Sequence, residues 1–182
     1  MTKSWTLGVD DGELSVRTGV AGPAARMGHR LTLAMTRWQA TVEWDAEQPD
    51  SAELVVEVDS LQVLRGDGGV KGLSGPEQAL ARSNALKSLS ANRFPEIRFI
   101  ADGIEKTADG YRLDGTLEIR NKTRAHVVDL RVDEEGDTWL LATESTVRQT
   151  DYGVKPYSML LGSLQVADEV TVAFSARRSK NT

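Results

Sequence analysis

The chain has 182 residues, of which 40% are hydrophobic, and carries a formal net charge of −5 with an isoelectric point near 5.1. This length predicts one domain over residues 1–182 with a sizeable core, and the acidic balance argues against a nucleic-acid partner, whose binding rests on clustered Lys and Arg. The sequence contains no cysteine, which excludes disulfides, Cys-ligated metals and thiol catalysis.

Alternation of apolar and polar residues with period two is the dominant pattern, and it is typical of half-buried strands. In residues 31–45, Trp38, Ala40, Val42 and Trp44 share one face. We expect about eight strands, at residues 13–18, 31–45, 53–64, 97–106, 111–120, 125–133, 138–148 and 169–178. The turns between the later strands are short, so sequential strands should pair antiparallel. Such a meander removes its exposed edges by closing, and the expected fold is an all-β, eight-stranded antiparallel barrel.

One segment, residues 74–91, predicts a helix instead. Ser74 followed by Glu77 has the form of a capping box, and Pro76 lies in the first turn. Ala81, Ala85 and Leu89 give a modest apolar stripe, so we expect a lid or plug helix across one end of the barrel. A shorter helical turn is expected within residues 22–27.

The chemical motifs are weak. The glycine-rich run at residues 66–72 has neither the spacing of a P-loop nor that of a dinucleotide fingerprint, and it is interpreted as a flexible connection. The two histidines, His29 and His126, form no HExxH pattern, so no metal site is expected. Structural hydrogen bonding is the first interpretation for His29, with contact to a ligand headgroup as the alternative, and a solvated or structural role is expected for His126.

Catalytic residues are not expected either. Ser158, Asp151 and His29 provide the residue types of a hydrolase triad, but no Gly-x-Ser-x-Gly elbow is present to position a nucleophile. The basic cluster formed by Arg120, Lys122 and Arg124 lacks interleaved aromatic residues, and a solvated face is its expected role.

The order of several motifs resembles the YceI-like family of lipocalin-like barrels. The motifs that carry the resemblance run through nearly the whole chain and are Met27-Gly28-His29, Val42-Glu43-Trp44-Asp45, the run 52–59 followed by Ser60-Leu61, the run 93–99, Leu113-Asp114-Gly115-Thr116-Leu117, Thr123-Arg124, the run 150–156 and the run 164–170. The resemblance implies an eight-stranded barrel with a helix near its mouth and an elongated apolar pore. No cofactor is expected. Its ligand would be a polyisoprenoid, an isoprenoid quinone or a similar long apolar molecule.

The resemblance also suggests which residues contact that ligand. The pore would be lined by Trp38, Val42, Trp44, Ile97, Phe99, Leu113, Leu117, Ile119, Val170, Val172 and Phe174. His29, Tyr152 and Tyr157 are the candidates for the mouth or headgroup region. The segment 74–91 lacks the His- and Asp-bearing pattern frequent in the family, which leaves the headgroup open.

Two other functions stay open at this point. The barrel could be filled by its own large side chains and act as a structural or protein-interaction module, or it could be a small-molecule enzyme, which predicts a perturbed titratable pair inside the pore. Pairing of two barrels into a homodimer is also open. The sequence as given shows no apolar leader and no apolar run of spanning length, so no transmembrane segment and a cytoplasmic location are expected.

Overall fold

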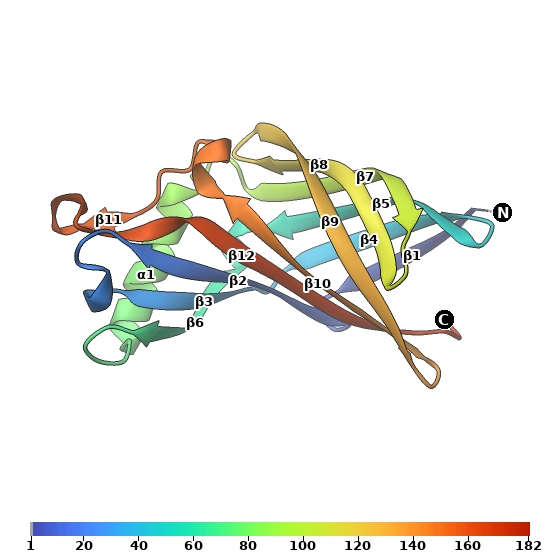
Figure 1. Cartoon of the computed structure of the whole chain (residues 1–182), viewed down its shortest axis with the longest axis horizontal. Coiled ribbons are helices and arrows are strands. Elements are labelled where there is room, and N and C mark those ends of the chain that lie inside the picture. Colours follow the sequence, from blue (N-terminus) through green and yellow to red (C-terminus); the bar gives the residue numbers. More distant parts are fainter. Residues whose placement is uncertain (1) are drawn as a thin grey trace.

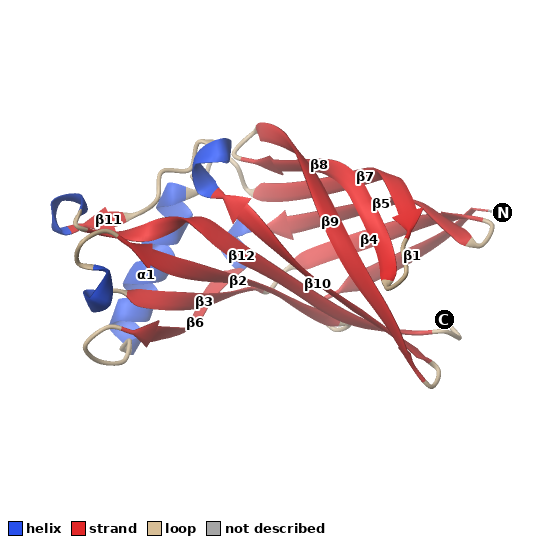
Figure 2. Ribbon diagram, in the orientation of Figure 1, coloured by secondary structure: helices blue, strands red, loops and turns tan. Residues whose placement is uncertain are grey.

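The computed structural model describes residues 2–182, which form one curled antiparallel sheet with a helix at one end (Figures 1 and 2). The strands are β1 (Thr2–Gly8), β2 (Gly12–Ala21), β3 (His29–Met35), β4 (Trp38–Asp45), β5 (Gln48–Glu57), β6 (Leu61–Gly68), β7 (Glu96–Lys106), β8 (Gly110–Ile119), β9 (Lys122–Glu135), β10 (Thr138–Arg148), β11 (Ser158–Met159) and β12 (Leu164–Ser179). The helix is α1 (Gly75–Ser88), and the 3-10 turns are η1 (Ala25–Met27), η2 (Val58–Ser60), η3 (Gln149–Tyr152) and η4 (Leu160–Gly162). The expected all-β, antiparallel, lipocalin-like fold is confirmed.

The strand count differs from the eight expected, because long strands are interrupted. Within residues 2–182, the sheet runs in the order β1-β4-β5-β7-β8-β9-β10-β12-β2-β3-β6, with β11 beside β12. The segment expected as one strand at 31–45 is divided into β3 and β4, and the segment expected at 53–64 is divided by η2. In the same way β1, which the periodicity did not reveal, continues into β2 across a short turn. If β1 with β2, β3 with β4 and β5 with β6 are each counted as one interrupted strand, the sheet has eight long strands. The two-residue β11 is additional.

Hydrogen bonds hold the chain at the interruptions, where the regular ladder is lost. The Thr36 hydroxyl donates to the Ser60 carbonyl over 2.8 Å, and the Ser60 hydroxyl donates to the Glu57 carbonyl over 2.7 Å. Arg37 pairs with the carboxylates of Glu57 and Asp59 on the outside. Since buried backbone groups need partners, these contacts let two neighbouring long strands bend together without leaving polar groups unpaired.

The predicted helix is present at one end of the sheet (Figure 2). Ser74 is its N-cap and accepts a hydrogen bond from the Glu77 backbone N–H, as the capping box predicts. Arg82 reaches from α1 to the sheet, donating to the main-chain oxygens of Leu61 at 2.7 Å and Asp59 at 2.6 Å. The helix is therefore fixed at the start of β6. No helix within residues 2–182 is both long and apolar enough to span a membrane.

Two hydrophobic clusters fill part of the interior. The first lies around Leu33, Met35, Trp38 and Leu61, and the second lies around Phe99, Leu117 and Tyr152. Leu89, just after α1, packs against both clusters. The helix end therefore joins the two halves of the core.

Candidate ligand-binding site

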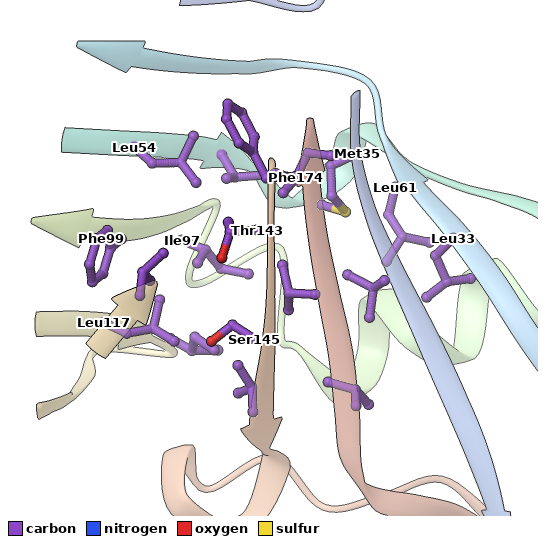
Figure 3. A pocket seen from close by; sticks show the side chains of 18 of the residues that line it. Leu33, Met35, Leu54, Leu61, Ile97, Phe99, Leu117, Thr143, Ser145 and Phe174 are labelled. Carbon is purple, nitrogen blue, oxygen red and sulfur yellow. The ribbon is translucent and has the colours of Figure 1, made fainter. Parts of the chain in front are cut away.

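A cavity of about 900 Å³ runs along the inside of the curled sheet. At the α1 end its wall includes Met27, Leu73 and Leu80, and at the opposite end it includes Trp44 and Trp139. Figure 3 shows the middle of this wall, where side chains from several strands point toward a common space. Most of the labelled side chains there are hydrocarbon, and a volume near the upper end of the range for small-molecule sites is left between them.

Ten of the eleven residues predicted to line the pore lie on the wall of this cavity. They are Val42, Trp44, Ile97, Phe99, Leu113, Leu117, Ile119, Val170, Val172 and Phe174. The remaining residue, Trp38, is buried in the first cluster, where its ring packs edge-on against Phe174 with 5.3 Å between ring centroids. Trp38 thus supports a wall residue from within the packed core.

The three residues predicted for the mouth also line the cavity, but at different depths. His29 and Tyr157 lie at the α1 end, where the His29 imidazole Nε2 is 2.6 Å from the Lys71 carbonyl oxygen. Tyr152 is only 3% exposed and belongs to the second buried cluster, so it lies deeper than a mouth residue. Burial raises the pKa of the Tyr152 hydroxyl, and the nearby Asp151 carboxylate raises it further, although Arg124 opposes the shift.

A polar pair interrupts the apolar wall. His126 on β9 and Ser145 on β10 form a hydrogen bond of 2.6 Å between Nε2 and Oγ, and both residues line the cavity. The Phe99 ring lies edge-on to the imidazole, with 6.1 Å between centroids. Burial lowers the pKa of His126 below its ordinary value, because the charged imidazolium loses hydration there.

This pair stands where two neighbouring strands separate. β9 and β10 share backbone pairing only between residues 131–135 and 138–142, and Figure 1 shows them diverging beyond that stretch. Past the last backbone pair, the Thr143 hydroxyl donates to the Asp129 carbonyl over 2.7 Å, and His126 meets Ser145. Hydrogen bonds made by side chains therefore replace the backbone hydrogen bonds of the sheet where the two strands separate. The sequence placed His126 within an alternating strand with a solvated or structural role, and nothing in it signalled that β10 would leave β9.

The basic cluster has a structural role beyond the solvated face that was expected. Arg124 Nε donates to the Asp151 carbonyl over 3.1 Å, and Arg120 donates to the Gly153 carbonyl. Both bonds hold η3 against the start of β9. The expectation treated these arginines as free because the return of η3 to this strand is a long-range contact that local patterns do not encode.

The end of the cavity opposite α1 is aromatic. Trp5 on β1 and Trp44 on β4 lie with ring centroids 4.6 Å apart, and the Arg178 guanidinium lies 4.9 Å from the Trp5 ring. Lys180 lies 4.6 Å from the Trp139 ring in the same way. Trp5 was not among the predicted site residues because β1 itself was not recognised.

Catalytic and metal-binding arrangements find little support in the part of the chain that the structure describes. Residues 2–182 hold no group of three or more His, Asp or Glu side chains suited to a metal ion. Of the triad candidates, His29 bonds the Lys71 carbonyl, and no hydrogen bond described for these residues joins it to Ser158 or Asp151. The polar pair His126 and Ser145 is the one Ser–His contact found among the described side-chain hydrogen bonds.

Comparison with known proteins gives a consistent result. A family model described as a YceI-like domain matches residues 12–177. The BcnA protein of Burkholderia cenocepacia superposes with a TM-score of 0.66 at 18% identity, over 92% of this chain and 96% of that one. The YCEI protein of Campylobacter jejuni superposes with a TM-score of 0.60 at 12% identity, over 81% and 83% of the two chains. A search among curated proteins finds no match.

Proposed function

The chain belongs to the YceI-like family, and on this premise we propose that its barrel binds one long apolar molecule, a polyisoprenoid, an isoprenoid quinone or a similar lipid. The observation that carries the proposal is the cavity of about 900 Å³ with its hydrocarbon wall. Burial of a ligand chain contributes up to about 0.8 kcal/mol per methylene before ordering costs. A slender apolar ligand therefore needs few polar contacts to bind tightly.

The ten predicted residues on the wall are proposed as contacts of the ligand chain. Among them, Phe99 and Leu117 lie near each other in the cavity wall, and Phe174 lies farther along it (Figure 3). His29 and Tyr157, at the α1 end, are proposed contacts of the polar head. His126 and Ser145 would offer a further hydrogen-bonding position for a hydroxyl or carbonyl group carried by the ligand.

Binding without chemical change is favoured over catalysis. A serine nucleophile needs a base that a third group orients, and the only side-chain hydrogen bond described for His126 is the one to Ser145. The interior also holds unfilled volume, which weighs against a barrel packed solid with its own side chains. We therefore infer a carrier or binding protein, and its cargo is the first unknown.

Mass spectrometry of the organic extract tests the proposal. Protein purified from its native host should carry a selectively enriched isoprenoid, quinone or lipid near one molecule per chain, when compared with an unrelated protein handled identically. An extract matching the control, together with no uptake of added polyprenols or fatty acids, would contradict ligand carriage. The filled-barrel module would then become the better interpretation.

Two substitutions of alanine by tryptophan test where the ligand binds. Ala40 lines the cavity, whereas Ala125 is exposed on the outside of β9. Ala40→Trp should reduce polyprenol uptake about tenfold or more, because a large ring takes up cavity volume, while Ala125→Trp should leave uptake unchanged. Equal uptake by both variants, with both shown by circular dichroism to be folded, would place the ligand elsewhere.

A further inference from the structure

Large apolar side chains protrude from three loops at the α1 end. With the ends of the strands and helix that border them, the loops cover residues 22–30, 66–75 and 155–163, and these three segments are called the apical loops below. Leu161 is fully exposed, Val70 is 85% exposed and Leu160 is 54% exposed. Figure 1 shows these loops at one tip of the long axis, while both chain termini lie at the other. Isolated apolar residues on a surface are common, but a group of them at one tip needs an explanation.

The apical loops touch one another and surround an opening of the cavity. The Ala24 backbone N–H donates to the Ser163 carbonyl over 2.8 Å, and His29 contacts the Lys71 carbonyl at 2.6 Å. Met27, Tyr157 and Met159 come from these loops, and they line the cavity while remaining exposed to solvent. The protruding apolar side chains therefore stand around the place where the cavity reaches the surface.

The backbone at the tip of one apical loop is held in a disfavoured conformation. Leu160 and Leu161 have φ values of 51° and 55°, in the left-handed region that side chains other than those of Gly, Asn and Asp rarely adopt. Two consecutive leucines here combine backbone strain with exposure of their side chains to water. The Ser163 backbone N–H and hydroxyl both donate to the Leu160 carbonyl and hold the turn, but the two leucine side chains stay exposed. Strained, exposed positions of this kind cluster at functional sites.

The charge of the apical loops is opposite to that of the whole chain. They contain four basic residues, Arg26, Arg30, Lys71 and Lys155, and one acidic residue, Asp67, which gives a formal charge of +3. The chain as a whole carries −5. The basic tip is attracted to anionic lipid headgroups, whereas the acidic remainder of the protein is repelled by them.

We propose that the apical loops dock on the surface of an anionic phospholipid bilayer. Leu160, Leu161 and Val70 would enter the boundary between headgroups and acyl chains, while the basic residues contact the phosphates. The exposed side chains of Leu160, Leu161 and Val70 protrude from two different loops, and such an arrangement fits a fluid lipid surface better than the fixed groove of a protein partner. The cavity opening would then face the membrane, where a long apolar molecule could pass without crossing water.

Flotation with lipid vesicles tests this docking without any cavity ligand. The probes are vesicles of phosphatidylcholine with phosphatidylglycerol, vesicles of phosphatidylcholine alone, and both at low and high salt. The full chain should bind the anionic vesicles, and salt should weaken binding as it screens the charges. Leu160→Asn and Leu161→Asn should each weaken binding about tenfold, since one leucine loses its burial.

Asparagine tolerates the left-handed backbone, so these variants should stay folded. The matched control is Val9→Asn, which removes a valine that is 47% exposed in the turn between β1 and β2, outside the apical loops. It should bind vesicles like the unchanged chain. All variants should take up a polyprenol from solution equally well, which separates docking from ligand binding.

Three outcomes would overturn the docking proposal. The first is no binding of the unchanged chain to anionic vesicles at low salt, and the second is equal binding by the leucine variants. The third is that the unchanged chain does not bind vesicles and forms a dimer in size-exclusion chromatography, while the leucine variants are monomers. That result would identify the apical loops as a surface between copies of the chain. None of these outcomes bears on whether the cavity binds a ligand.

Discussion

At the scale of single residues, His126 has the most informative environment. It lies in the wall between β9 and β10, bonds Ser145, and its pKa is lowered by burial. The unfolded chain therefore binds a proton more readily than the folded chain as the pH falls through the ordinary histidine value near 6.5. The free energy of unfolding should decrease from pH 7.5 toward pH 5.5, and the decrease should level off once folded His126 is also protonated.

The variant His126→Gln isolates this contribution. Glutamine can keep a hydrogen bond to Ser145 but does not titrate, so urea unfolding should show a smaller loss of stability between the two pH values than in the unchanged chain. The other titrating groups are common to both proteins and cancel in the comparison. An identical pH dependence in the two proteins would show that His126 is not desolvated in the folded state.

At the scale of elements, α1 depends on Arg82 for its position across the sheet end. The guanidinium donates to the carbonyls of Asp59 and Leu61, at 2.6 and 2.7 Å, in the region where η2 interrupts a long strand. Arg82→Met keeps the apolar stem but removes both bonds, and it should lower the free energy of unfolding by about 1–2 kcal/mol. Lys87→Met, at an exposed position of the same helix, should change it by less than about 0.5 kcal/mol. Hydrogen exchange of the α1 backbone amides should be faster in Arg82→Met than in the unchanged chain, and unchanged in Lys87→Met. If exchange in Arg82→Met equals that of the unchanged chain, apolar contacts alone hold the helix.

Local sequence patterns predicted the elements well where one signal dominated. The alternation in residues 138–148 matches β10 at both ends, and the capping box of Ser74 and Glu77 marks the start of α1. The breaks in the long strands were not predicted, because Thr36, Arg37 and Ser60 are polar residues that period two places as readily inside a strand. Their role depends on hydrogen bonds between neighbouring strands, which no local pattern contains.

At the scale of the whole molecule, the inward faces of the strands combine into one apolar cavity. The residues that the family resemblance and the inward strand faces suggested form part of its wall, but they gave no volume, since the same inward residues could have packed solid. Trp38 shows the difference: it has the right face and the right chemistry, yet it packs in the core against Phe174. Whether an inward residue lines a space or fills it depends on the curvature of the sheet, which only the three-dimensional structure provides.

The cavity predicts how affinity should change with ligand length. Each added methylene that is buried should strengthen binding up to about fourfold, and the gain should stop once the cavity of about 900 Å³ is full. Competition measurements with polyprenols of increasing length should therefore show a steep rise followed by a plateau. In Ala40→Trp the plateau should begin at a shorter chain, because less volume is left. If affinity does not depend on ligand length, the ligand binds through its headgroup alone. If affinity rises without a plateau, the ligand associates with the outer surface, because only an enclosed space limits the length that can be buried.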